Sequence, residues 1–155
     1  MTEPTHIDER GNARMVDVST KPETQRVAVA EAIITMGDEA RRALFGGTLP
    51  KGDALAVARI AAINGAKRTS ELVPLCHPLP ITGISVTVEE HPAGARLEVT
   101  VSTVGRTGVE MEAITGASVG VIAIYDMIKA VDRGAEIGPV RLVAKHGGKS
   151  GEWSR

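Results

Sequence analysis

Two segments with helical spacing of apolar residues are separated along this chain by segments that have the two-residue alternation of β-strands. Small apolar residues recur at helical spacing from about Asp53 to Arg68, where Asp53 can cap the first turn. A longer helix is predicted from about Glu110 to Val131, with Gly134 placed to end it. Two such helices between strands indicate an α+β domain.

The strand-like segments number four. The first runs from Arg26 to Met36 and the last from Val140 to Ala144. Between the helices, apolar and polar residues alternate on both sides of a turn from His91 to Gly94, which predicts a β-hairpin. Its apolar positions are Ile84, Val86 and Val88 on one strand and Leu97, Val99 and Val101 on the other.

The order strand, helix, strand, strand, helix, strand is the split βαβ pattern. It predicts a ferredoxin-like α+β fold, in which two helices pack on one face of an antiparallel four-stranded sheet. Aromatic residues make up only 2% of the chain, so the core must be built from small and branched aliphatic side chains. Such side chains favour close packing of helices on the sheet.

Length and composition predict one domain over residues 1–155, since no repeat, low-complexity tract or long linker divides the chain. The polar residues from about 1 to 20 are expected to form an extended or partly ordered arm. Residues from about 146 to 155 are expected to form a flexible tail rich in glycine and lysine.

The charge balance indicates that neither nucleic acid nor a membrane is a partner. There are 18 basic and 19 acidic residues, so no overall field attracts polyanions or anionic lipid. The most apolar run, Ala113 to Ile124, is too short to span a bilayer and predicts a buried helix. A single cysteine excludes an intrachain disulfide, and the start Met1 to Pro4 lacks the features of a signal peptide. We therefore expect a cytoplasmic protein.

The only cysteine, Cys76, stands next to His77 in a segment that Pro74, Pro78 and Pro80 keep out of any helix. The pair could be a nucleophile with its base, part of a metal site, or a ligand contact. A zinc site would need further ligands at suitable spacing, which the sequence lacks. Adjacent side chains in an extended segment point to opposite sides, which disfavours a catalytic dyad. Taken alone, His77 fits a structural role.

The second helix carries charged residues near both of its ends. Asp126 and Lys129 are three positions apart and share one face, either as an ordinary surface ion pair or as an acid and an amine that tune each other. Glu110 and Glu112 lie at the start, where the helix dipole favours carboxylates.

Lysines outside this helix would hold a polyphosphate if the fold brought them together. They are Lys51, Lys67, Lys145 and Lys149. Gly148-Lys149-Ser150 is similar to the end of a Walker A loop, but the first glycine of that motif would fall at Val143, inside a strand. No helix can follow in the few remaining residues, so the sequence does not predict a P-loop.

Several short motifs in the same order resemble the MoaC family, the cyclic pyranopterin monophosphate synthases of molybdenum cofactor biosynthesis. The motifs are Lys51–Asp53, Ala58–Ala61, Ala66–Thr69, Pro74–Leu79, Thr107–Ala113, Ile124–Met127 with Lys129–Ala130, Ile137–Leu142 and Gly147–Gly151. The resemblance extends from about Thr5 to Gly151. It departs at residues 45–50, at residues 91–96, and at Gly116 and Gly120, where the family pattern leads us to expect small residues such as alanine.

The resemblance implies a lyase that converts a cyclised dihydro-GTP intermediate into a pyranopterin with a cyclic phosphate and releases pyrophosphate. By position, Asp126 matches the family's catalytic aspartate, Lys129 its neighbouring lysine, and Lys51 a lysine implicated in catalysis. The positions that match substrate-binding segments are Leu75, Cys76, His77, Glu110, Met111 and Glu112. Those that resemble the pocket for the phosphates and base are Lys67, Lys145 and Lys149. On this basis His77 is assigned to substrate contact and Cys76 mainly to packing.

The resemblance also implies homodimers assembled into a hexamer, with the active site at the dimer interface. Glu112 and Asp126 are fourteen positions apart, about 21 Å along one helix, so one small pocket cannot hold both from a single chain. No cofactor is certain; magnesium could share the phosphate charge, although no carboxylate cluster demands it. A regulatory domain that only binds nucleotides, and a structural assembly protein, are the alternative functions.

Overall fold

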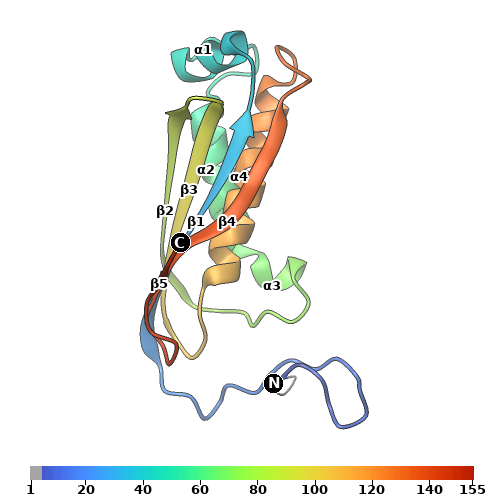
Figure 1. The fold of residues 1–155 in the computed structure, drawn as a ribbon, viewed down its shortest axis with the longest axis vertical. Helices are drawn as coiled ribbons and strands as arrows, with labels where there is room; N and C mark the ends of the chain where they lie inside the picture. Colours follow the sequence, from blue (N-terminus) through green and yellow to red (C-terminus); the bar gives the residue numbers. More distant parts are fainter. Residues whose placement is uncertain (1–4) are drawn as a thin grey trace.

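The computed structural model describes residues 5–155 and confirms an α+β fold with a layer of helices on one face of an antiparallel sheet (Figure 1). Residues 1–4 lie outside the described part. They are the start of the expected arm and the segment that was predicted to lack the features of a signal peptide. In chain order the elements are β1 (Thr24–Thr35), α1 (Asp38–Gly46), α2 (Ala54–Lys67), α3 (Thr69–Leu72), β2 (Ile81–His91), β3 (Gly94–Gly105), α4 (Glu110–Ile128), β4 (Glu136–His146) and β5 (Trp153–Ser154).

The sheet has the strand order β2-β3-β1-β4-β5, and all neighbouring strands are antiparallel. Its first four strands are the predicted ones, in the order of a split βαβ fold. The sequence did not predict the fifth, β5, which pairs with β4 at the edge of the sheet within the tail expected to be flexible. It also did not predict the short helices α1 and α3.

The core lies between the sheet and the two long helices, α2 and α4. Alternate residues of β1, from Ala28 to Ile34, are fully buried on the helix side. The helices approach so closely that a Cβ atom on Gly65 of α2 would lie 2.7 Å from Val119 Cβ of α4. A Cβ atom on Gly120 would lie 2.6 Å from Leu97 Cδ1 of β3. Glycine at this position, where the family pattern favours alanine, therefore fits a closer approach of α4 to the sheet.

The apolar run Ala113 to Ile124 lies within helix α4, which spans 19 residues. By length and composition alone, α4 is the one helix among the described residues that could cross a membrane. However, 56% of its most apolar window is buried inside the protein, between α2 and the sheet. It is the core helix of this fold.

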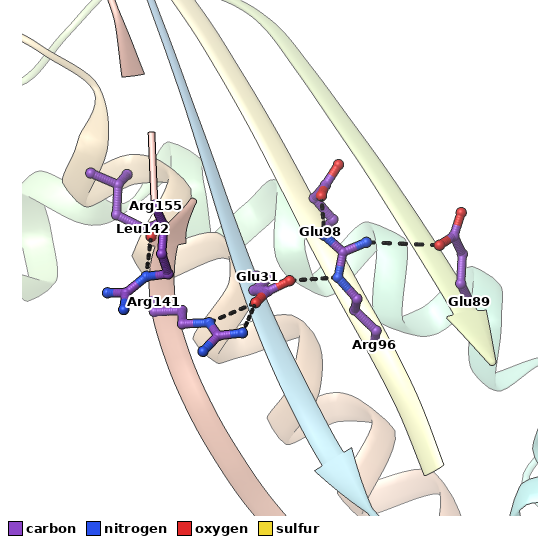
Figure 2. A network of polar contacts seen from close by, with 7 residues as sticks. All are labelled: Glu31, Glu89, Arg96, Glu98, Arg141, Leu142 and Arg155. Atoms are coloured by element: carbon purple, nitrogen blue, oxygen red, sulfur yellow. Dashed lines mark hydrogen bonds and ion pairs between the residues drawn. The ribbon is translucent and has the colours of Figure 1, made fainter. Parts of the chain in front are cut away.

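The other face of the sheet carries a network of ion pairs (Figure 2). Its centre is Glu31 of β1, which accepts hydrogen bonds from Arg96 Nε at 2.5 Å and from Arg141 Nε at 2.7 Å. Arg96 also pairs with Glu98 and with Glu89. Burial raises the pKa of Glu31, but the hydrogen bonds from both arginines outweigh it and hold that pKa below its usual value. The face of the sheet that no helix covers thus carries charged side chains that are paired with one another.

Candidate active site

A carboxylate held by two lysines lies at the C-terminal end of α4. Asp126 Oδ2 is 2.8 Å from Lys51 Nζ, and Asp126 Oδ1 is 2.7 Å from Lys129 Nζ. Lys51 Nζ also donates to the backbone oxygen of Asp126 at 2.9 Å. Hydrogen bonds from Lys129 and Lys51 lower the pKa of Asp126 to about 2. The structure therefore brings together the three residues assigned to catalysis, with Asp126 ionised at neutral pH.

A tight turn before α2 places Lys51 on this carboxylate. Leu49 is buried, and the Gly52 N–H donates to Leu49 O at 3.0 Å with Gly52 at a φ of 96°. The Asp53 side chain then accepts from the Ala56 N–H at 2.9 Å and caps α2, as predicted. Lys51 is thus positioned between the buried Leu49 and the capped start of α2.

A shallow pocket of about 300 Å³ adjoins this cluster. Lys51 and Lys129 line it together with Arg133, Tyr125 and Ala130. Tyr125 donates its hydroxyl hydrogen to Arg133 O at 3.1 Å, which ties the segment after α4 to the helix. The charged residues that line the pocket are all basic, and the adjoining Asp126 carboxylate offsets part of their charge.

The other end of α4 forms a second pocket, of about 310 Å³, with residues of the Cys-His segment and the N-terminal arm. All six residues assigned to substrate binding line it: Leu75, Cys76, His77, Glu110, Met111 and Glu112. Glu112 is only 4% exposed, and burial, together with the charge of Glu110, raises the pKa of its carboxyl group. Among residues 5–155, no basic group lies within 4.0 Å of this carboxyl group.

Cys76 and His77 have different surroundings in this pocket. His77 Nε2 is 2.8 Å from Val16 O, so the histidine holds the N-terminal arm against the body of the domain. Burial and the charge of Glu112 raise the pKa of the Cys76 thiol. A thiol that keeps its proton at neutral pH is a poor nucleophile, which favours the packing interpretation of Cys76.

A third and larger pocket, of about 710 Å³, adjoins the second, and Lys21 and Glu110 line both. Lys145 and Lys149 line it as the sequence led us to expect. Lys145 Nζ lies 3.4 Å from a carboxylate oxygen of Glu110. Lys67 is exposed at the end of α2 and is not among the residues that line any of the three pockets.

Three basic residues of this large pocket were missed by the sequence reasoning: Lys21, Arg26 and Arg106. Arg26 lies on β1, and its Nε donates to Gly105 O at the end of β3 at 3.0 Å. The pairing of Thr24 with Gly105 brings these segments together. The sequence predicted both strands but not their register, and the register was the signal that would have found these arginines.

The pockets at the two ends of α4 are separate in one chain. The helix runs without a break from Glu110 to Ile128, and its fourteen positions from Glu112 to Asp126 correspond to about 21 Å. The buried carboxyl group and the lysine-held carboxylate therefore cannot contact one small ligand within the same chain.

Within residues 5–155, no three His, Cys, Asp or Glu side chains gather in the way that a metal site needs.

Comparisons with known proteins show to which family the chain belongs. Residues 15–148 match the MoaC family. A cyclic pyranopterin monophosphate synthase of Thermomicrobium roseum is 54% identical, covering 100% of this chain and 95% of that protein. Another, of Corynebacterium efficiens, is 54% identical over 99% of both chains, and one of Roseiflexus castenholzii is 53% identical over 98% of both. The chain belongs to the MoaC family.

Proposed function

We propose that this chain is an enzyme of molybdenum cofactor biosynthesis that converts 3',8-cyclo-7,8-dihydro-GTP to cyclic pyranopterin monophosphate and releases pyrophosphate. The relatives that cover nearly the whole chain carry the name of this activity. The observation that carries the proposal is the cluster of Lys51, Asp126 and Lys129, in which both lysines contact one carboxylate. A regulatory or structural domain has no need of such a cluster.

The cluster is suited to proton transfer during ring opening and re-closure. With a pKa of about 2, Asp126 is ionised at neutral pH and keeps two ammonium groups in fixed positions. Protons must move to and from several nitrogen and carbon atoms of the substrate, which general acid–base groups can assist. Lys51 and Lys129 are the groups that carry protons, and Asp126 orients them beside the substrate.

The large basic pocket is suited to the triphosphate. Five basic side chains line it: Lys21, Arg26, Arg106, Lys145 and Lys149. Among residues 5–155, Glu110 is its only acidic lining residue. Attack of a sugar hydroxyl on the α-phosphate builds negative charge on the phosphoryl oxygens and on the departing pyrophosphate. Fixed cations stabilise that charge, and charge-assisted hydrogen bonds to phosphate are among the strong ones. The neighbouring pocket with Glu112 then receives the purine-derived ring.

The complete active site is shared between two chains. Among residues 5–155, no basic group lies within 4.0 Å of the buried Glu112 carboxyl group, although Lys21 lines the same pocket. Lys51 and Lys129 lie at the far end of α4. A two-fold dimer that runs the two α4 helices antiparallel places each end beside its complement, twice. Three such dimers form a hexamer, in line with the family resemblance, and the assembly works in the cytoplasm on a small molecule.

A turnover assay tests this function. Purified chain supplied with 3',8-cyclo-7,8-dihydro-GTP should release one pyrophosphate for each pyranopterin formed, in the absence of any redox partner. A ligand-binding regulatory domain would instead bind the compound and release it unchanged. Binding without pyrophosphate release, by chain that is folded and assembled, would contradict the proposal.

A further inference from the structure

The C-terminal residues of the chain fold back along the edge of the sheet. β5 pairs with the end of β4 in antiparallel register, with Trp153 opposite Lys145. Beyond β5, the Arg155 N–H donates to Val143 O at 2.9 Å, and Arg155 Nε donates to Leu142 O at 3.3 Å (Figure 2). The tail is therefore closed into a hairpin with β4.

The turn of this hairpin, residues 147–152, lies directly on β1. Three of its glycines have positive φ, and the Gly151 N–H closes the turn on Gly148 O at 3.1 Å. A Cβ atom on Gly147 would lie 2.2 Å from Gln25 O, a backbone atom of β1, and one on Gly148 would lie 2.1 Å from Arg26 Nη1. The turn backbone thus approaches β1 more closely than a residue with a side chain would allow.

The same turn forms a wall of the large basic pocket. Gly148, Lys149 and Ser150 line that pocket together with Arg26. Lys145, at the base of the hairpin, contacts Ser150 Oγ with its ammonium group. Within residues 5–155, no carboxylate pairs with Lys149, so its cation is available to a ligand in the pocket.

We propose that β5 is a clasp that places Lys149 and the glycine turn at the phosphate site. The inference rests on the proposed function in one respect, that phosphates occupy the basic pocket. A free tail would sample many positions, and binding would have to order it. Pairing with β4 pre-organises the tail before the ligand arrives. Trp153 and Arg155 are thus positioning residues that act through Lys149.

Inorganic triphosphate is the probe, and calorimetry with the assembled protein gives its Kd. Deletion of residues 153–155 should raise the Kd roughly tenfold, the effect of one charged hydrogen bond, and should raise the KM for substrate by a similar factor. The kcat should fall as well, because Lys149 also stabilises the charge that builds on the departing pyrophosphate. An unchanged circular dichroism spectrum and an unchanged mass of the assembly would show that the deletion keeps the fold.

A substitution in the full-length chain provides a second test. Gly151 has a φ of 65°, and no atom lies within 4 Å of the Cβ that a side chain would add. Gly151→Val strains the backbone of the turn without a clash and should reproduce the loss of triphosphate affinity. Gly151→Asn is the matched control, since asparagine tolerates a left-handed backbone, and it should bind nearly as the native chain does.

A double-mutant cycle separates the clasp from the phosphate assignment. Lys149→Ala should weaken triphosphate binding in the full-length chain and have much less effect after deletion of residues 153–155, because the clasp acts through that lysine. Equal effects in both chains, or a deletion without effect, would overturn the clasp alone. If Lys149→Ala leaves triphosphate affinity unchanged in an active full-length chain, both the phosphate assignment and the clasp are overturned. If substrate is not turned over but triphosphate binds in the expected pattern, the clasp stands and the proposed reaction fails.

Discussion

Asp126 forms ion pairs with two lysines from different parts of the chain, and each of its carboxylate oxygens contacts one of them. Because catalysis is assigned to this cluster, Asp126→Asn and Lys51→Ala should each lower kcat at least about a hundredfold. Both variants should keep their fold, since the side chains are largely exposed. Arg42→Ala, an exposed change on α1, is the control. Near-normal turnover in either variant would refute the assignment.

The same contacts set a pH dependence. The pKa of Asp126 falls from 3.8 to about 2, so the folded state stabilises the ionised carboxylate more than the unfolded state does. This contribution to the free energy of unfolding is fully present above about pH 4 and is lost as the pH falls toward about 2. In carboxyl-carbon NMR, Asp126 should show no titration step between about pH 3 and pH 5. A titration midpoint of Asp126 near the ordinary value would mean that the lysines do not contact its carboxylate in solution.

Cys76 is predicted to be a packing residue with a protonated thiol. Because burial and Glu112 raise its pKa, alkylation by iodoacetamide should be slow at neutral pH and should accelerate only above the pH typical of free thiols. Cys76→Ala should keep most of the turnover and cost at most about 1 kcal/mol of unfolding free energy. Loss of turnover in folded, assembled Cys76→Ala would instead restore the nucleophile interpretation.

Among the elements, helices α2 and α4 pack against each other with little spare room. Gly65→Ala would bring a Cβ atom to 2.7 Å from Val119 Cβ, so one helix must move. Overpacking of this kind costs about 1–3 kcal/mol, whereas the gain in helix propensity is at most about 1 kcal/mol. We expect a net loss of roughly 1 kcal/mol in urea unfolding.

The control for this prediction is Gly46→Ala. Gly46 ends α1, and no atom lies within 4 Å of the Cβ that alanine would add. Its unfolding free energy should stay within about 0.5 kcal/mol of the native chain or increase. A Gly65→Ala variant as stable as Gly46→Ala would show that the helices are less tightly packed than the structure indicates.

Elements with a strong and long apolar period could be predicted from the sequence. The two long helices and the hairpin carry that period over many residues, so local spacing was enough to find them. Helix α1 and strand β5 are short, and their formation depends on contacts with distant segments. β5 consists of two residues, and its backbone pairs with β4, an interaction that no side-chain pattern encodes.

The site was predictable only in part. Spacing along one helix was enough to bring Asp126 and Lys129 together. Lys51 joins them from 75 positions away. The sequence pattern placed it only among the lysines that would hold a polyphosphate, and its assignment to catalysis came from the family resemblance. Arg26 and Arg106 stayed hidden because their proximity depends on the register between β1 and β3.

At the scale of the whole molecule, a net charge of -1 conceals charged clusters at both ends of α4. One end carries the buried Glu112 beside the basic pocket, and the other carries Asp126 between Lys51 and Lys129. Antiparallel pairing of two α4 helices would bring unlike ends together at both sites. The central claim is therefore that each active site takes Glu112 from one chain and Asp126 from the other.

Complementation of two inactive variants measures this directly. Glu112→Ala and Asp126→Asn are each first shown to be inactive, then mixed in equal amounts, with subunit exchange verified by mass. About half of the dimers are then mixed, and each mixed dimer holds one intact and one doubly mutated site. Turnover of 3',8-cyclo-7,8-dihydro-GTP should return to about a quarter of the native value. Mixtures as inactive as the separate variants would contradict a shared site in this arrangement.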